Sequence, residues 1–382
     1  MNFAFSEEQE ELRRTVRQFL EAKSPETEVR RLMETTEGYD PSVWKQMGQE
    51  LGLQSLAIPE EFGGQGFTFI ELGIVLEEMG RVLLCAPYFS SAVLAANAIL
   101  NVGTDDQKKE LLPGIASGDT IATLAFTEPS GKWDAAGITM EATEGEGGRF
   151  TLSGEKMFVL DGFTADLIVV VARTAGSSGA DGISFYTVRG DADGLTRTTL
   201  STMDMTRKQA KLEFNNVEAK PLGSTEDGFA AFSKTLDQAA VALSNEMMGG
   251  AQKVLDMSVE YAKVRVQFGR PIGSFQAIKH KCADMLLEVE SGKSAAYYAS
   301  WAAAEDNDEL PVVAALSKAY CSEAYFHATA ENIQIHGGIG FTWEHPAHLY
   351  YKRAKTSEFL FGDVQYHRET LADLIGLERS TA

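Results

Sequence analysis

The chain has 382 residues and a mass of 41.6 kDa, which is too long for one ordinary domain and predicts two or three. Hydrophobic residues make up 44% and charged residues 23%, as in globular proteins and unlike disordered ones. The formal net charge of −21 argues against binding to nucleic acid or to an anionic membrane surface, because a polyanion repels phosphate groups.

Three cysteines lie far apart, at Cys85, Cys282 and Cys321, in apolar or helical stretches. Their number and spacing predict neither a disulfide framework nor a zinc site, and are typical of a reducing compartment. The N-terminus lacks the basic and apolar regions of a secretory signal, and no apolar run approaches the ~20 residues that span a bilayer. We therefore expect a soluble protein of the cytoplasm.

Helical patterns fill residues 1–120, which we predict to form an N-terminal α-helical domain. Ser6 stands three residues before Gln9, as in a capping box, and apolar residues then recur at helical spacing. Asp40, followed by proline, predicts a second helix start, and Thr104 predicts a third.

The pattern changes at residues 121–225, which we predict to form a middle antiparallel β domain. Short strand-like runs are separated by Gly, Asp and Ser turns at close spacing, which suits a small sandwich or barrel. The runs cover residues 121–126, 150–152, 157–160, 167–172, 183–188 and, more weakly, 211–214.

Long helical patterns return in residues 226–382, which we predict to form a C-terminal four-helix bundle. The predicted helices cover residues 230–265, 274–304, 311–336 and 345–374. The fold class is therefore α+β multi-domain, and the absence of βαβ alternation argues against a Rossmann fold.

Three motifs then stand in order along the chain. Thr-Glu-Pro occupies residues 127–129, at the end of the first strand of the middle domain. A run from Tyr261 to Gly269 closes a long helix, with Phe-Gln-Ala-Ile at 275–278 behind it, and residues 334–341 read Gln-Ile-His-Gly-Gly-Ile-Gly-Phe. Over essentially its whole length the chain resembles the acyl-CoA dehydrogenase family. The resemblance implies FAD as cofactor and an acyl-CoA as substrate.

The resemblance also implies which residues contact FAD. In the family, a strand end presents backbone groups to the flavin edge, an arginine reaches the pyrophosphate of a neighbouring subunit's FAD, and glycines let the backbone approach the dinucleotide. The residues of this chain at those positions are Phe126, Thr127, Phe158, Leu160, Arg265, Phe268, Gln276, Gln334, Gly337 and Gly338. For Arg265 a salt-bridged surface arginine, and for the glycines a plain helix-to-helix turn, stay open as alternatives.

The middle domain departs from the family pattern at three positions. Trp133 stands where a small hydroxyl residue contacts cofactor or pantetheine, so we count it as substrate-binding. Phe158 replaces a tryptophan and can still stack on the flavin, whereas Leu160 replaces a threonine and has no side-chain donor.

The usual positions of the catalytic base hold no acid. Dehydrogenation removes a proton from Cα and a hydride from Cβ, and the proton needs a carboxylate in a desolvated pocket. Most of the family carries that Glu near the C-terminus, where this chain has Phe361, and a second branch carries it where this chain has Ala239. The backbone N–H of Phe361 can still polarise the thioester carbonyl, because it survives replacement of the side chain.

Glu246 is the base that we predict instead. It lies seven residues past Ala239, about two helical turns, and so lies on the same face of the helix. The two positions are ~10.5 Å apart along the helix axis, so the substrate or the helix must be placed differently. The arrangement resembles an actinobacterial-type branch assigned to bulky or branched acyl-CoAs such as sterol side chains. The flanking methionines and Gly249–Gly250 predict a roomy pocket wall. A helix–helix or subunit contact by Glu246 is the alternative, and Asp363 and Glu358 are competing acids.

Two further clusters of side chains, one basic and one of histidines, are candidate binding sites. Residues 352–355 hold three basic side chains that suit CoA phosphates or a plain helix surface. His345 and His348 have metal-ligand spacing but no evident third ligand, so no metal is expected.

The resemblance also bears on partners. It implies electron transfer to an electron-transfer flavoprotein and a homo- or hetero-oligomer built as a dimer of dimers. The empty base positions keep a second class open, a non-catalytic or half-site subunit of a heteromeric dehydrogenase. A third reading, an acyl-CoA oxidase, is less favoured because oxidases are usually longer.

Overall fold

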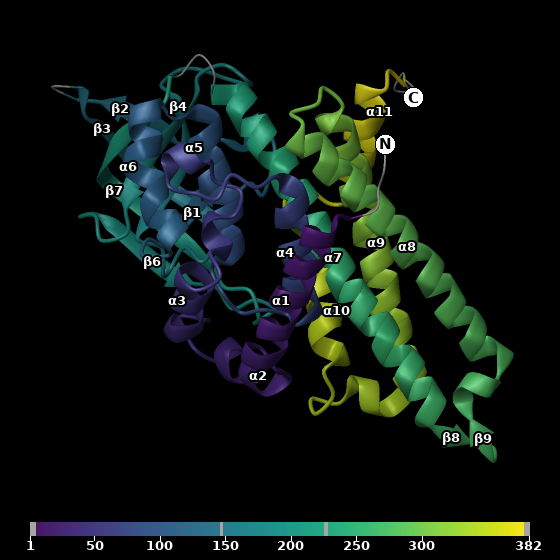
Figure 1. Cartoon of the computed structure of the whole chain (residues 1–382). Coiled ribbons are helices and arrows are strands. Elements are labelled where there is room, and N and C mark those ends of the chain that lie inside the picture. The colour runs from purple at the N-terminus through teal and green to yellow at the C-terminus, as the bar shows by residue number, and fades with distance from the viewer. Residues whose placement is uncertain (1–4, 146–147, 225–227, 378–382) are drawn as a thin grey trace. The chain divides into compact units, whose positions relative to one another are not determined.

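The computed structural model describes residues 5–145, 148–224 and 228–377 (Figure 1). Contacts group the chain into two compact units, each assembled from separate stretches. The helical unit comprises Met1–Arg30, Phe69–Leu84 and Ala240–Ala382, and the β unit comprises Arg31–Thr68 and Cys85–Ala239. The division into domains at 1–120, 121–225 and 226–382 stays a prediction, and its second boundary touches residues outside the described part.

The β unit is built around one sheet that closes on itself. The strands are β1 (Ala122–Ala125), β2 (Glu141–Glu144), β3 (Phe150–Leu160), β4 (Leu167–Thr174), β5 (Ile183–Arg189), β6 (Leu195–Thr199) and β7 (Gln209–Leu222). They pair in the order β1-β4-β2-β3-β7-β5, β6 adds to β7, and a β4–β5 pairing closes the ring. The predicted middle β domain is confirmed.

Three details of that sheet differ from the prediction. The two runs predicted at 150–152 and 157–160 are one strand, β3. Strands β2 and β6 were not predicted, because their residues are mostly polar and exposed and so lack the apolar alternation that marks a strand. β4 pairs in parallel with β1 and with β2, whereas its pairing with β5 and the pairings of β7 are antiparallel.

Helices of the β unit start where the sequence predicted. Asp40 caps its helix by accepting hydrogen bonds from the backbone N–H groups of Ser42 and Val43, and Thr104 forms a capping box with Gln107. The helices of this unit are α3 (Pro41–Gln49), α5 (Ala96–Val102) and α6 (Asp105–Ser117), with a π-helical turn at Phe89–Ala95. Helices α2 (Glu26–Met33) and α7 (Gly228–Val264) span the unit boundary.

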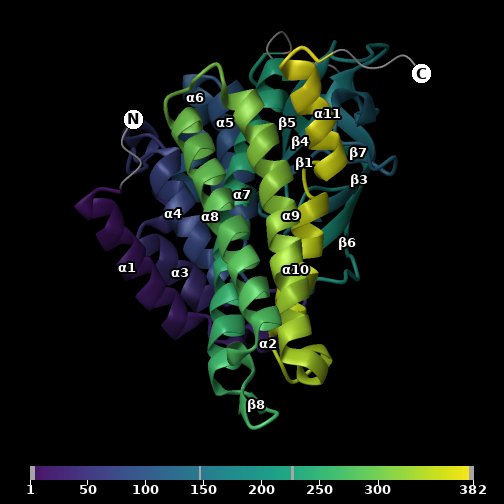
Figure 2. The ribbon, with the colours of Figure 1, turned by 90° about the vertical axis from the view of Figure 1, so that its right-hand side faces the viewer.

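The helical unit is a bundle of long helices (Figure 2). The expected capping box at Ser6 is present at the start of α1. The helices are α1 (Glu7–Lys23), α4 (Phe69–Arg81), the part of α7 (Gly228–Val264) from residue 240 on, α8 (Gln276–Ala304), α9 (Leu310–His336), α10 (Ala347–Phe359) and α11 (Val364–Leu374). A hairpin of β8 (Val266–Gln267) and β9 (Arg270–Pro271) joins α7 to α8.

The helix predicted over 345–374 is wrong as one element, because the chain turns between α10 and α11. Phe361 has a φ of 60° and Gly362 a φ of 109°, values that an α-helix cannot contain. Asp363 then caps the N-terminus of α11 by accepting from the backbone N–H of Tyr366 at 2.8 Å. The helical spacing of the apolar residues continues through this turn, so the sequence predicted one helix instead of two.

Helices α4 and α7 cross with their backbones in close contact. A Cβ added to Gly80 would lie 1.9 Å from the Glu246 carbonyl oxygen, and one added to Gly249 would lie 1.8 Å from the Glu77 carbonyl oxygen. A Cβ on Gly250 would lie 2.3 Å from the Tyr325 hydroxyl oxygen. The predicted roomy wall at Gly249–Gly250 is therefore wrong, because helix α4 and an aromatic ring already fill that space.

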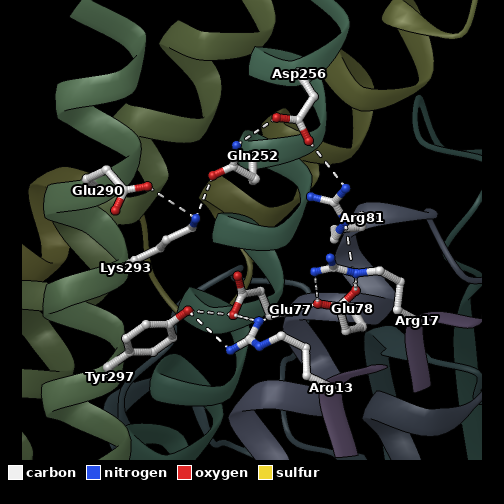
Figure 3. Close-up of polar contacts among 10 residues, drawn as sticks. All are labelled: Arg13, Arg17, Glu77, Glu78, Arg81, Gln252, Asp256, Glu290, Lys293 and Tyr297. Atoms are coloured by element: carbon white, nitrogen blue, oxygen red, sulfur yellow. Dashed lines mark hydrogen bonds and ion pairs between the residues drawn. The ribbon is translucent and has the colours of Figure 1, made fainter. Parts of the chain in front are cut away.

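A chain of polar contacts binds α1 to α4 and α8 (Figure 3). Arg17 grips the buried Glu78 with two hydrogen bonds of 2.7 and 2.8 Å, and Arg13 reaches Glu77 at 2.8 Å. Tyr297 donates its hydroxyl hydrogen to Glu77 at 2.7 Å. Two buried carboxylates of α4 are thus paired with arginines of α1, and Glu78 also lies 3.8 Å from Arg81 of its own helix.

Candidate functional site

Most of the residues predicted to contact FAD in the helical unit meet at one end of the bundle. The β8–β9 hairpin and the turn after α9 lie together there (Figure 2), and the rings of Tyr261 and His336 stack with centroids 4.2 Å apart. The exposed residues at this end that were predicted as FAD contacts are Arg265, Phe268, Gln276, Gln334, Gly337 and Gly338.

These side chains are available to a group outside the unit. Phe268, at the hairpin tip, has a φ of 53° and is 91% exposed. Arg265 is exposed and forms no ion pair within the described part of the chain, so the alternative of a salt-bridged arginine has no support there. The Gly337 φ of 63° favours glycine, and a Cβ on Gly337 or Gly338 would meet open space. An unpaired guanidinium beside an exposed aromatic ring and open backbone fits a dinucleotide.

In the β unit, the predicted flavin edge follows strand β1. Phe126 is buried against Phe232, with ring centroids 5.6 Å apart, and Thr127 accepts from the Met157 backbone N–H at 2.8 Å. The fully buried Lys156 donates to the Phe126 carbonyl oxygen at 3.2 Å and to Glu128 at 2.8 Å. The buried Lys156–Glu128 ion pair therefore fixes the backbone at the end of β1.

A bulge in β3 turns one predicted flavin contact outward. The register with β7 shifts between Lys156 and Val159, and Phe158 there has a φ of 56° and is 48% exposed. A bulky residue held in the left-handed region is a strained arrangement of the kind found at binding sites. Leu160 is buried and its carbonyl accepts from the Thr123 hydroxyl at 2.6 Å, while Trp133 is half-buried.

Glu246, the predicted base, lies in a buried ion pair. Its carboxylate is 2.9 Å from the Arg353 guanidinium, and the two side chains are 8% and 4% exposed. The helix–helix contact that the sequence left open is thus present, between α7 and α10. Arg353 is buried by this pairing, so the prediction that counted it in a surface basic cluster is wrong.

Phe361 sits in a turn whose carbonyls are held by two buried side chains. Lys318 on α9 is fully buried and donates to the carbonyl oxygens of Glu358 and Gly362, both at 3.0 Å. His367 Nε2 lies 2.9 Å from the Phe361 carbonyl oxygen. Burial lowers the pKa of Lys318 to about 7, and burial and the Lys318 charge lower the pKa of His367 to about 4.

The other acids differ in how they are engaged. Asp363 caps α11, and Glu358 pairs with Lys355 at 2.9 Å, so each already has a structural contact. Asp237 on α7, two residues before Ala239, was not singled out from the sequence. Burial raises its pKa to about 7, and no hydrogen bond or ion pair in the described part of the chain offsets that burial. Its only sequence signal was its place beside an empty base position.

The two histidines with metal-ligand spacing are engaged with rings. His345 packs on His336 with centroids 4.4 Å apart, and His348 stacks on Trp343 at 4.6 Å. Within residues 5–145, 148–224 and 228–377, no group of three potential His, Cys, Asp or Glu ligands could hold a metal ion. No helix in the same ranges is long and apolar enough to cross a membrane.

Comparison with known proteins identifies the family. The models of the acyl-CoA dehydrogenase N-terminal, middle and C-terminal domains match residues 6–119, 123–217 and 226–376. Acyl-CoA dehydrogenase IpdE2 of Mycolicibacterium smegmatis is 36% identical over 94% of this chain and 95% of its own. The chain belongs to the acyl-CoA dehydrogenase family.

Solved structures agree with that assignment. Butyryl-CoA dehydrogenase from Megasphaera elsdenii superposes with a TM-score of 0.92 at 28% identity, covering 98% of this chain and 100% of that one. A variant of the Tcur3481-Tcur3483 steroid ACAD has a TM-score of 0.87 at 30% identity, covering 97% and 98%. As an acyl-CoA dehydrogenase the chain is an oxidoreductase acting on CH–CH bonds, with FAD as its cofactor.

Proposed function

We propose that the chain oxidises the Cα–Cβ bond of a bulky or branched acyl-CoA to the 2-enoyl-CoA. The observation that carries the proposal is the exposed cluster of Arg265, Phe268 and Gln334 at one end of the bundle, residues that match the family's FAD contacts. The likeness to a steroid ACAD supports a bulky acyl group. The likeness to the ChsE4-ChsE5 complex of Mycobacterium tuberculosis, at 27% identity and a TM-score of 0.88, supports assembly with a second kind of chain.

The roles of the residues follow from their positions. FAD, when bound, would supply the acceptor for the hydride that leaves Cβ. Arg265 would hold the pyrophosphate and Phe268 would pack on the adenine of a neighbouring subunit's FAD. Phe158 would lie against the flavin, and Trp133 would border the substrate. The backbone N–H of Phe361 would donate to the thioester carbonyl, which makes the Cα proton more acidic.

Glu246 remains our proposed base, and Asp237 becomes the competing one. Glu246 forms an ion pair with Arg353, so a proton taken up by Glu246 would have to weaken that pair. Asp237 has the raised pKa that a general base uses near neutral pH. Neither Asp363 nor Glu358 has an observation in its favour beyond its position.

The test of the base compares Glu246→Gln with Asp237→Asn in flavin-loaded protein. The substrates are straight-chain, branched and steroid side-chain acyl-CoAs, and the signal is bleaching of the flavin band. Loss of bleaching in Glu246→Gln alone supports Glu246, and loss in Asp237→Asn alone transfers the role. Glu290→Gln, an acid on the exposed face of α8, is the control for removing one carboxylate.

A non-catalytic or half-site subunit of a heteromeric dehydrogenase is the second candidate. It is favoured by Phe361 and Ala239 at the two usual base positions and by the structural ion pair of Glu246. Purifying the chain alone and measuring its FAD content separates the two. About one FAD per chain supports a self-sufficient enzyme, and colourless protein supports a missing partner chain.

Partners complete the proposal. An electron-transfer flavoprotein would accept the electrons, and a structure described as an electron transferring flavoprotein of Acidaminococcus fermentans matches at 29% identity and a TM-score of 0.93. Exposed apolar residues beside the hairpin, such as Val264 and Phe341, suit a second subunit in a dimer of dimers.

Peroxide formation during turnover would point instead to an oxidase. A cytoplasmic location fits the three described cysteines, which form no disulfide.

A further inference from the structure

Lys318 is a buried lysine to which the proposed chemistry assigns no role. It lies on α9 with none of its surface exposed. Its ammonium donates to the carbonyl oxygens of Glu358 and Gly362 and, at 3.1 Å, to the hydroxyl of Ser322. Three acceptors match the three hydrogens of the ammonium, so its hydrogen-bonding capacity is filled.

The contacts of Lys318 converge on the turn that carries Phe361. Glu358 precedes Phe361 by three residues near the end of α10, and Gly362 follows it directly. His367 reaches back from α11 to the carbonyl of Phe361 itself. Carbonyls before, at and after the turn residue are therefore held by two buried side chains, from α9 and α11.

This turn needs such support because its backbone is strained. A φ of 60° at Phe361 lies in the left-handed region, which is disfavoured for a residue with a Cβ. Gly362 leaves no room for a side chain, since a Cβ there would lie 2.4 Å from the Tyr366 ring and 2.8 Å from His367 Nε2. Strained residues persist where their surroundings fix them, and they are concentrated at active sites.

We infer that Lys318, together with His367, is a positioning residue that aims the Phe361 backbone N–H at the thioester carbonyl. The inference rests on the donor role of Phe361 in the proposed function. A backbone donor stabilises a developing oxyanion only if it is fixed before the reaction. The two side chains supply that fixation without touching substrate.

The experiment measures polarisation of a bound thioester in the flavin-loaded protein. The probe is acetoacetyl-CoA, whose Cα proton becomes more acidic when its thioester carbonyl accepts a hydrogen bond, and whose enolate absorbs in the near ultraviolet. Wild-type protein is expected to raise the enolate fraction of the bound probe above that in water. Lys318→Met is expected to lower the ratio of enolate to neutral probe about tenfold, which is one unit in the apparent pKa of the probe.

Matched variants separate positioning from general stability. Tyr297→Phe removes the hydrogen bond to Glu77 and is expected to lower thermal stability but leave the enolate fraction at the wild-type value. His367→Leu is expected to lower the fraction, and His367→Gln, which can still donate to the Phe361 carbonyl, to restore part of it. These His367 variants decide the matter if Lys318→Met does not bind FAD.

The experiment separates failure of the positioning role from failure of the proposed donor role of Phe361. Wild-type protein that binds FAD but does not acidify the probe would refute the donor role of Phe361, and the inference with it. Wild-type protein that acidifies the probe, with Lys318→Met and His367→Leu acting equally well, would overturn the inference alone.

Discussion

The two units each contain a fully buried lysine, and the two are stabilised in different ways. In the β unit, Lys156 pairs with the carboxylate of Glu128 at 2.8 Å and also donates to the Phe126 carbonyl. In the helical unit, Lys318 donates to two backbone carbonyls and a hydroxyl. Burial lowers both pKa values, to about 8 for Lys156, where the Glu128 charge opposes the shift, and to about 7 for Lys318.

The difference shows two ways to satisfy a buried amine. A carboxylate partner attracts the ammonium strongly, but the carboxylate must itself be buried. Removing either ion therefore leaves the other as a buried charge without its partner. Carbonyl partners stabilise the buried amine less, but they leave no buried charge behind when the amine is removed. In both cases the lysine holds backbone beside a residue of the proposed site.

The largest expected effect is on stability when Lys156 is removed. Lys156→Met leaves Glu128 buried without its cation, although that carboxylate still accepts from the backbone N–H groups of Thr139 and Met140. We expect a loss of about 3–5 kcal/mol, measured by denaturant unfolding. The double variant Lys156→Met/Glu128→Gln should recover much of the loss, and a double variant as unstable as the single one would contradict this account.

Removing Lys318 should cost less. Lys318→Met leaves the acceptors of Glu358 and Gly362 without a donor but no stranded charge, so about 1–3 kcal/mol is expected in the same measurement. A loss larger than that of Lys156→Met would show that the comparison between ionic and carbonyl partners is wrong.

The pH dependence of stability should sharpen the comparison. The pKa of Lys318 is about 7 in the folded protein and near its ordinary value of 10.5 when unfolded. Between those values the unfolded chain binds the extra proton, so the stability contributed by this residue rises with pH across that window. Unfolding midpoints of wild-type protein and Lys318→Met, measured from pH 7 to 10, should therefore separate in favour of wild type. Parallel curves would contradict the lowered pKa.

The smallest effect is expected in the network on α1. Arg17 is 41% exposed at its side chain and shares Glu78 with Arg13 and Arg81. Arg17→Met leaves two cations near that carboxylate, so the loss should be about 1 kcal/mol or less and should shrink in high salt. A loss as large as that of Lys156→Met would mean that the three arginines do not substitute for one another.

Local signals in the sequence predicted much of the fold. The helix starts at Ser6, Asp40 and Thr104 follow from short-range hydrogen bonds that a sequence displays directly. The break at Phe361 and Gly362 was missed although Gly362 and the Asp363 cap mark it locally, because the apolar spacing continues through it. The support that Lys318 of α9 gives to this turn is long-range and could not be predicted.

The candidate site divides along the same line. The exposed cluster around Arg265 and Phe268 follows from contiguous motifs, so the resemblance located it. The partner of Glu246 could not be found, because Arg353 lies 107 positions away and a basic run on a helix is usually on the surface. Burial of Lys156 and Lys318 was missed for the same reason. The roles assigned to the site residues stay predictions.

The turn between α10 and α11 separates backbone shape from side-chain identity at position 361. Its conformation depends on Gly362, the Asp363 cap, Lys318 and His367. Any residue with a Cβ meets backbone strain there, so the backbone shape of the turn does not itself require a phenyl ring. A reactive side chain could therefore be lost or gained at position 361 while the backbone N–H, which we propose as the thioester donor, keeps its place.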